Sequence, residues 1–345
     1  MSTILGIEST AHTFGVAVVK NGKILSNVKD SFTTEKGGII PIEAARHHHN
    51  ITDIILQKSL DEAKISNKEL DAIAFSQGPG LAPCLIEGKN FAKKIAQELN
   101  IPIVPVNHCV AHLEIGKTVG ATNPVMLYAS GANTQIIAYS ENFSKEIQQR
   151  RKIDKHSCNA SGKYRVFGET LDLGVGNFID TVARFMGMGF PGGPKIAELA
   201  EKSKNYIELP YSIKGMDVSF SGMQTKLRQL YETGTKKEDI SFSLQETAFA
   251  MLVEAAERAM AHTGKTELLL GGGVGCNTRL KEMCEIMCKE RGAKFFVPEN
   301  SLLVDNGAMI AYLGEIMFNA GIKGNLKTID INSKQRTDDV EVKWK

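Results

Sequence analysis

We expect no segment of the sequence to hold the protein in a membrane or to export it. No apolar run approaches the about 18 uninterrupted residues that a transmembrane helix needs. The N-terminus, MSTILGIEST, lacks the basic start and the long apolar stretch of a signal peptide. These two absences lead us to expect a cytoplasmic protein.

Cysteine and net charge are also scarce. The six cysteines are scattered and form no CxxC pair, so in a chain without a secretion signal we expect reduced thiols. The 41 basic and 39 acidic side chains leave a formal net charge of only +2. No global field therefore attracts nucleic acid, and RNA binding would have to come from a local basic patch or from partner subunits.

What is present indicates an α/β protein of two lobes. The 345 residues are too many for one ordinary core, and 42% hydrophobic with 23% charged residues is typical of a globular protein. Short β-rich runs alternate with helical patterns, and each half opens with a strand, a polar turn and a strand. We expect strands at 3–9, 14–20, 23–33, 71–76, 101–106, 125–129, 135–140, 267–270 and 293–297, and helices at 42–63, 85–99, 173–186, 194–204, 241–262, 277–291 and 306–320.

The repeated opening divides the chain into two architecturally similar parts. We assign residues 1–122, with a returning helix at 306–322, to an N-terminal ribonuclease H-like lobe, and residues 123–305 to a second such lobe. Residues 141–163 are polar and irregular, which predicts a flexible insertion, and residues 323–345 form a polar C-terminal tail. Two lobes create a central cleft, the usual place for a ligand.

Two hydroxyl-rich turns stand at equivalent places in the two lobes. The first covers residues 8–13 and the second covers residues 130–134. Such turns direct backbone N–H groups and hydroxyls at an anion, although most turns of this composition are only turns. Their matching positions favour a polyphosphate gripped from both sides. The candidate phosphate-contacting or catalytic residues are Glu8, Ser9, Thr10, Asn133 and Thr134.

The histidines His108 and His112 are the sharpest local signal. On a helix, their four-residue spacing places both imidazoles on one face about 5–6 Å apart, which suits one metal ion. The sequence is HCVAH rather than HExxH, so the adjacent general base of many metallopeptidases is missing. Two packed histidines remain the alternative. Asp305, a possible third ligand, also fits a plain helix N-cap.

Three further features each allow two interpretations. Residues 271–275, GGGVG, stand between a strand and a helix, where glycines permit either close approach to a ligand or tight packing. Asn277 either binds an adenine or ribose or caps the helix that follows. Successive residues of a helix point about 100° apart, so His47, His48 and His49 do not share one ion, and we assign them a structural or surface role.

The order of motifs along the chain resembles one family. The segments that carry the likeness extend almost from end to end: GIESTAHTFGVAVV, FSQGPGL, VNHCVAHLEIGK, LYASGANTQIIAY, YRVFGETLDLGVGN, GFPGGPKIAELA, LPYSIKGMDVSFSGM, FSLQETAFAMLVE, GGGVGCNTRL and DNGAMIAYLG. They are similar to the universal tRNA threonylcarbamoyltransferase family. The likeness is strongest to its archaeal and eukaryotic branch, the catalytic subunit of the KEOPS complex, and the C-terminal RTDDVEVKWK fits that branch.

The resemblance implies an actin-like, sugar-kinase-like ATPase fold of two ribonuclease H-like lobes. It implies transfer of threonylcarbamoyl from threonylcarbamoyl-AMP to N6 of the adenosine just 3′ of the anticodon, in tRNAs that read codons beginning with A. The implied partners are tRNA and other KEOPS subunits: a small kinase-like ATPase, a small dimerising subunit on the N-terminal lobe and a tRNA-binding subunit. Without the resemblance, the alternatives are a sugar-kinase-type phosphotransferase, a metallopeptidase and a nucleotide-dependent binding subunit.

The resemblance also implies the residues of the site. One divalent ion per subunit, iron in first place and zinc in second, would be held by His108, His112 and Asp305, with Tyr128 as a nearby or fourth ligand. Mixed nitrogen and oxygen ligands suit both metals. Threonylcarbamoyl-AMP or ATP would lie in the cleft. The implied nucleotide-binding residues are Tyr128, Ala129, Ser130, Gly131, Ala132, Asp180, Gly193 and Asn277.

The chain departs from the family pattern at three places. Ala132 replaces a usual glycine, which costs little unless its φ is positive. Ala197 stands where archaeal relatives often have a nucleotide-contacting glutamate. Residues 141–163 are about twenty residues longer than the hairpin expected there, which is unusual for a compact domain.

Overall fold

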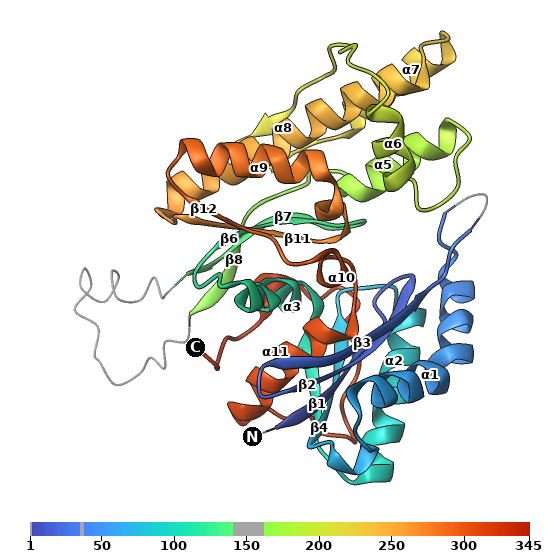
Figure 1. Ribbon diagram of the computed structural model, residues 1–345, viewed down its shortest axis with the longest axis vertical. Helices are drawn as coiled ribbons and strands as arrows, with labels where there is room; N and C mark the ends of the chain where they lie inside the picture. The colour runs from blue at the N-terminus through green and yellow to red at the C-terminus, as the bar shows by residue number, and fades with distance from the viewer. Residues whose placement is uncertain (1, 35–37, 141–161) are drawn as a thin grey trace.

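The structure is a computed structural model that describes residues 2–34, 38–140 and 162–345. The predicted insertion at 141–163 therefore lies outside the described residues except for its last two positions. Two five-stranded sheets form the centres of the two halves of the molecule, one above the other in Figure 1. Among the described residues, every helix is too short or too polar to span a bilayer.

The lower half is built on the sheet β3-β2-β1-β4-β5. Strands β1 to β3 are antiparallel, and β4 and β5 run parallel to β1. Helices α1 and α2 cover one face, whereas α11, from near the end of the chain, covers the other (Figure 1). The elements are β1 (Thr3–Glu8), β2 (Thr13–Lys20), β3 (Lys23–Ser31), α1 (Pro41–Ala63), η1 (Asn67–Glu69), β4 (Ala72–Gly78), α2 (Ala82–Leu99), β5 (Ile103–Asn107), α3 (His108–Glu114), η2 (Ile115–Val119) and α11 (Gly307–Asn319).

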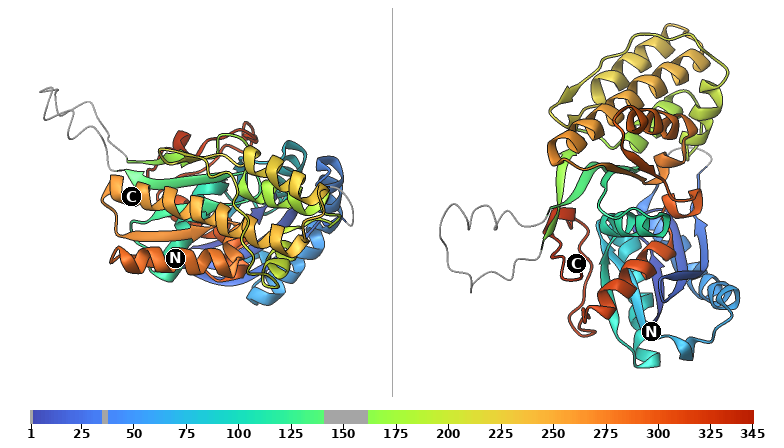
Figure 2. Two further views of the ribbon diagram at one scale, coloured as in Figure 1. Left: turned by 90° about the horizontal axis from the view of Figure 1, so that it is seen from above. Right: turned by 60° about the vertical axis from the view of Figure 1, so that its left-hand side comes forward.

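The upper half is built on the sheet β12-β11-β6-β7-β8, with its helices gathered on the outer face except for the short helix at 300–303, which lies between the halves (Figures 1 and 2). Its elements are β6 (Val125–Ala129), β7 (Thr134–Ser140), β8 (Lys163–Glu169), α5 (Val175–Phe185), α6 (Gly193–Ala200), β9 (Ile213–Lys214), β10 (Asp217–Val218), α7 (Ser221–Glu232), α8 (Lys237–Thr263), β11 (Glu267–Gly271), η3 (Gly273–Cys276), α9 (Thr278–Glu290), β12 (Lys294–Phe296) and α10 (Asn300–Leu303).

Strand β6 shows how the two halves share a core. Its side chains alternate between the two faces of the sheet. Val125, Leu127 and Ala129 pack under the outer helices, whereas Met126 and Tyr128 join a second core with α3 and α11. Helix α3 thus lies between the sheets, and alternation alone turns Tyr128 toward it.

Most predicted elements are present within a few residues of their expected ends, and the differences have local causes. Strand β8 follows directly on the polar segment and was not expected. Helix α7 was also not expected, because only Met223 and Leu227 of its residues are buried and two apolar positions make a weak helical pattern. Helix α8 begins at Lys237 rather than at residue 241, since its first turn is polar.

The C-terminal segment after α11 packs against both halves. Gly324 and Glu341 form β-bridges to β5 and β8, respectively. Val342 is fully buried, and Nε1 of Trp344 donates to the carboxylate of Glu114 on α3 at 3.2 Å. The segment is polar in composition, but a few apolar side chains hold it beside the helix that carries both histidines.

Candidate active site

The junction between β5 and α3 places the two histidines. Asn107 caps the helix, because its side-chain oxygen accepts a hydrogen bond from the amide of Val110 at 3.0 Å. His108 is therefore the first helical residue, and His112 follows one turn later. Both side chains are buried, with ring centroids 4.8 Å apart. The four-residue spacing is thus realised on one face of a short helix.

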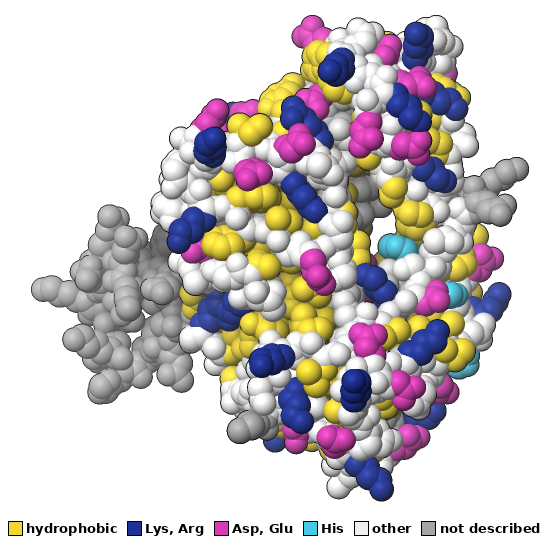
Figure 3. Space-filling view, viewed as in Figure 1, with side chains coloured by type: hydrophobic (Ala, Val, Ile, Leu, Met, Phe, Trp, Pro, Cys, Tyr) yellow, Lys and Arg dark blue, Asp and Glu magenta, His cyan; other side chains and the backbone are white. Residues whose placement is uncertain are grey.

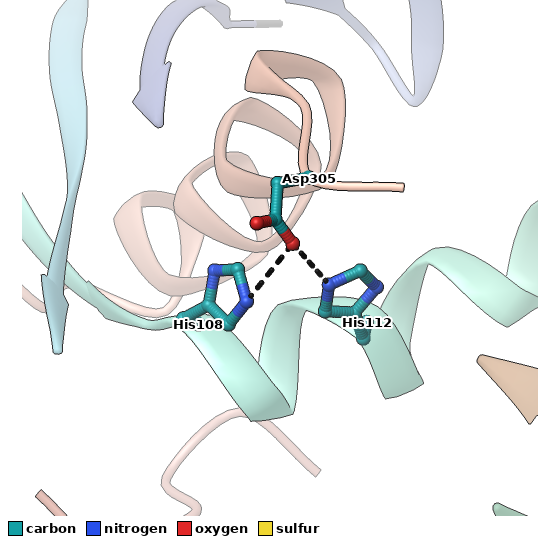
Figure 4. A group of neighbouring side chains, drawn as sticks. All are labelled: His108, His112 and Asp305. Atoms are coloured by element: carbon teal, nitrogen blue, oxygen red, sulfur yellow. Dashed lines mark hydrogen bonds and ion pairs between the residues drawn. The ribbon is translucent and has the colours of Figure 1, made fainter. Parts of the chain in front are cut away.

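Asp305 reaches the same point from the other end of the chain. Its Oδ1 lies 3.4 Å from Nε2 of His108 and 3.4 Å from Nε2 of His112 (Figure 4). The interpretation of Asp305 as a helix cap is wrong, because the side chain of Asn306 caps α11 by accepting from the amide of Met309 at 3.0 Å. The Asp305 carboxylate is left to face the histidines.

Glu8, at the end of β1, orients His108. Its Oε2 accepts a hydrogen bond from Nδ1 of the imidazole at 3.0 Å, and its Oε1 accepts from the amide of Thr10 at 2.7 Å and from the Thr10 hydroxyl. A carboxylate that accepts from Nδ1 fixes the orientation of the ring, so that Nε2 points toward Asp305. Glu8 is fully buried with both oxygens engaged, so its geometry favours an orienting role over that of a general base.

Tyr128 completes the cluster from the second sheet. Its hydroxyl lies 3.1 Å from Nε2 of His108, and its ring centroid lies 5.0 Å from that of His112. Burial, followed by the charges of Cys109 and Asp305, raises the pKa of Tyr128 well above its usual value. The structure therefore brings all four residues of the implied ligand set to one place.

The electrostatics of this cluster favour a positive charge. Burial opposes protonation of His108, but the carboxylates of Glu8 and Asp305 outweigh it and raise its pKa well above the ordinary value. Burial lowers the pKa of His112. Burial also opposes ionisation of Asp305, but His108 and then His112 hold its pKa well below the usual range. The carboxylates of Glu8 and Asp305 thus favour a positive charge between them.

These donors fit a divalent metal ion. The ligand atoms of His108, His112 and Asp305 all lie within 4.8 Å of one another. The nitrogen–oxygen separations of 3.4 Å match the edge of a tetrahedron with metal–ligand bonds of about 2.0–2.2 Å. Two imidazole nitrogens and a carboxylate oxygen are ligands that both iron and zinc accept.

The first polar turn lies next to this cluster. The hydroxyl of Thr10 is 3.4 Å from Nδ1 of His108, and the amide of Ser9 donates to the hydroxyl of Ser76 at 3.0 Å. Figure 3 shows the surface hollowed between the two halves, with a histidine side chain at the edge of the hollow. The His12 ring of the turn lies 5.2 Å from the Phe190 ring of the upper half, centroid to centroid, so the turn lies where the two halves face each other.

The second polar turn meets the other side of α3. Nδ2 of Asn133 lies 4.0 Å from Sγ of Cys109, and the hydroxyl of Thr134 accepts from the amide of Val175 at 2.7 Å. Sequence reasoning does not assign Cys109 a role, although its place next to His108 on a helix turns its side chain away from the two imidazoles and toward this turn. Ala132 has no positive φ, so alanine is tolerated where the family usually has glycine.

The remaining implied nucleotide-binding residues support loops and helix ends. Oδ1 of Asp180 accepts from the amide of Gly192 at 2.7 Å and so fixes the entry to α6, which begins at Gly193. Asn277 caps α9 with its oxygen and donates from Nδ2 to Gln245 at 2.8 Å. The capping interpretation of Asn277 is confirmed, and its amide is occupied within the upper half.

Within the glycine run after β11, Gly272 is required for packing. Gly272 has φ +88°, and a Cβ there would lie 2.4 Å from the carbonyl oxygen of Ala129, at the end of β6. Any other residue would push the second turn away from β11.

A separate cavity of about 490 Å³ lies between α11 and the C-terminal segment, away from the two turns.

Comparison with known proteins identifies close relatives over the whole chain. The family model described as tRNA N6-adenosine threonylcarbamoyltransferase matches residues 23–161 and 154–312. A protein of that description from Thermococcus sibiricus is 53% identical over 341 residues, which cover 99% of each chain. A Methanosarcina mazei protein described as a probable bifunctional tRNA threonylcarbamoyladenosine biosynthesis protein is 50% identical, and the match covers 99% of this chain and 59% of that one.

Solved structures show the fold. The crystal structure of HypF from T. kodakarensis matches with a TM-score of 0.60 at 15% identity, over 93% of this chain and 48% of that one. At this identity the likeness carries only the fold. The expected actin-like, sugar-kinase-like ATPase fold is confirmed.

Proposed function

The chain belongs to the tRNA N6-adenosine threonylcarbamoyltransferase family, and from that premise we propose that it transfers threonylcarbamoyl from threonylcarbamoyl-AMP to N6 of the adenosine just 3′ of the anticodon. Its tRNAs would be those that read codons beginning with A, in the cytoplasm. The observation that carries the proposal is the convergence of His108, His112 and Asp305 between two polar turns.

We also propose that the reaction depends on one divalent ion, iron in first place and zinc in second. His108, His112 and Asp305 would hold it, with Tyr128 beside them. A bound ion supplies Lewis-acid polarisation of a carbonyl or phosphate oxygen of the donor. Glu8 would keep the His108 ring in the orientation that offers Nε2 to the ion.

The two turns would hold the donor. Threonylcarbamoyl-AMP is a mixed anhydride and is already activated, so the protein has to bind it, orient it and stabilise the departing phosphate. Backbone amides and hydroxyls of the turns at residues 8–13 and 130–134 suit that task, because the phosphate gains negative charge as it leaves. The target adenosine must leave its stack to reach the cleft.

Partner subunits would supply much of the grip on tRNA. A net charge of +2 gives the chain little attraction for a polyanion by itself. The likeness to the KEOPS branch supports a complex with a kinase-like ATPase, a dimerising subunit and a tRNA-binding subunit. ATP in the cleft is the second candidate occupant.

Reconstitution tests the proposed activity. The purified chain is mixed with its partner subunits, tRNA, threonine, bicarbonate, ATP and the adenylate-forming enzyme, and the tRNA is digested and analysed by mass spectrometry for threonylcarbamoyladenosine. Absence of product from folded, metal-loaded protein would count against the transferase.

Two matched substitutions test the metal dependence. His108→Ala should remove the ion and the activity together, whereas His262→Ala, at an exposed position of α8, should change neither. Full activity of a His108→Ala protein that has lost its metal would refute the Lewis-acid role.

The alternative, a sugar-kinase-type reaction, needs a carboxylate that is free to deprotonate a hydroxyl, but Glu8 and Asp305 are both paired with histidines.

A further inference from the structure

Helix α1 carries three consecutive histidines that the structure separates. The partly buried His47 lies 3.0 Å from Asp30, and the exposed His49 lies 3.0 Å from Glu87. His48 between them is fully buried. Because helical steps of about 100° turn each ring a different way, only the middle ring points into the lower half.

The ring of His48 reaches from α1 to the first polar turn. Its Nε2 lies 2.9 Å from the carbonyl oxygen of Ala11, and since a carbonyl can only accept, Nε2 carries the proton. Its Nδ1 has no hydrogen-bond partner among the described residues. Burial lowers the pKa of His48 to about 4, which keeps the ring neutral at pH 7. His48 is thus a buried donor with one fixed target.

Three consecutive carbonyl groups of the turn are held by three different elements. The carbonyl of Thr10 accepts from the backbone amide just before α2 at 2.8 Å, and that of His12 accepts from the backbone amide just after β3 at 2.9 Å. The carbonyl of Ala11 lies between them and accepts from His48. Only this middle position is held by a side chain.

The amides at the tip of the same turn are unpaired. Within the described part of the chain, the backbone N–H groups of Ala11 and His12 have no hydrogen-bond partner, and both residues are partly exposed. The His12 ring lies 5.2 Å from that of Phe190 in the upper half, so the tip faces across the cleft. Adjacent unpaired amides in a turn form an anion-binding site.

The second turn is held in the same way by backbone donors alone. The carbonyls of Ser130 and Gly131 accept from the amides of Gly176 and Asn177, at 3.0 and 2.9 Å, at the start of α5. In both turns, therefore, carbonyl oxygens that would repel an anion are tied to the protein. The first turn needs a side chain for this, because backbone amides hold only its flanking carbonyls.

We propose that His48 is a positioning residue of the active site: its Nε2–H holds the carbonyl of Ala11 so that the amides of Ala11 and His12 bind the phosphate of the nucleotide. His48 acts through the turn and does not itself touch the ligand. The inference rests on the proposed function for the identity of that ligand, an adenylate in the cleft.

Binding of AMP and of adenosine by the metal-loaded full chain separates this role from a general structural one. His48→Phe keeps the ring but removes the donor, and His48→Gln places an N–H group at a similar distance along the side chain. We expect calorimetry to show AMP binding weakened about 3- to 10-fold by phenylalanine, with adenosine binding and metal content unchanged. Glutamine should restore AMP binding, and His49→Phe, the same change at an exposed position of α1, should have no effect.

Each other outcome has a defined meaning. Equal weakening of AMP and adenosine binding by His48→Phe, or wild-type AMP binding, would overturn the positioning role. If the phenylalanine variant does not fold, His48→Met replaces it, and if neither donor-less variant folds while His48→Gln does, His48 serves stability and the inference is wrong. Wild-type protein that binds neither AMP nor adenosine would instead contradict the nucleotide site of the proposed function.

Discussion

Replacing Gly6 with alanine should separate α11 from the first sheet, and Asp305 from the two histidines. A Cβ on Gly6 would lie 2.3 Å from the amide nitrogen of Ala311 and 2.4 Å from the carbonyl oxygen of Gly307. Ordinary contacts of a Cβ lie at 3.4–4 Å, so strand and helix must part by roughly 1 Å in a close-packed interior. Both neighbours are backbone atoms, which cannot swing aside as a side chain does.

The magnitude follows from this geometry. Overpacking lowers the free energy of unfolding by about 1–3 kcal/mol. Because the clash in Gly6→Ala is between two backbones, we expect a loss of about 3 kcal/mol. With an unfolding entropy of about 2.1 cal/mol/K per residue, the 345-residue chain should lose about 4 °C in Tm. Asp305 lies just before α11 and would move with it. A misplacement of about 1 Å can lower activity up to about 100-fold, and metal content should fall in parallel.

Scanning calorimetry, metal analysis and the transfer assay measure these effects together. Gly222→Ala on α7 is the matched control, because its Cβ would lie 3.9 Å from the nearest atom, on Pro210, and alanine favours a helix. Its Tm should stay or rise slightly. Wild-type Tm and metal content in Gly6→Ala would refute the claim that close packing of α11 on β1 holds Asp305 in place.

Three further predictions concern stability. Glu114→Gln should lower the free energy of unfolding by about 1–3 kcal/mol in urea titrations, because this buried carboxylate pairs with Lys117 at 2.5 Å and accepts from Trp344 at 3.2 Å; an unchanged midpoint would contradict it. Burial lowers the pKa of His48 from an ordinary 6.5 to about 4 in the folded protein, so the unfolded chain takes up the proton first as the pH falls. The neutral ring therefore contributes about 3 kcal/mol to the free energy of unfolding above pH 6.5, and this contribution is lost by about pH 4. The ionisable groups facing the ring are His47, His12 and Glu8. His48→Gln should lack this loss in urea titrations across that range, and equal pH profiles of the two proteins would disprove the assignment. A chelator that removes the metal should abolish threonylcarbamoyl transfer. The far-UV circular dichroism should not change, because each half has its own hydrophobic core. Loss of the dichroism signal would show that the metal holds the fold.

Local pattern alone determined much of this protein. Two strands joined by a polar turn recur in both halves because period-two alternation and turn composition are short-range properties of the chain. The spacing of His108 and His112 predicted a shared face because helix geometry sets it. The ordered motifs identified the family, and with it the fold and the four residues that the structure brings together.

The tertiary structure decided what depends on distant segments. Asp305 and Asn306 suit a helix cap equally well, and only the packing of α11 on β1 shows that Asn306 caps while Asp305 faces the histidines. Likewise, three identical histidines in a row differ only in which one the helix turns inward, so His48 was indistinguishable from His47 and His49. Periodicity encodes neighbours within a few residues, whereas burial and pairing of polar groups depend on which remote element arrives beside them.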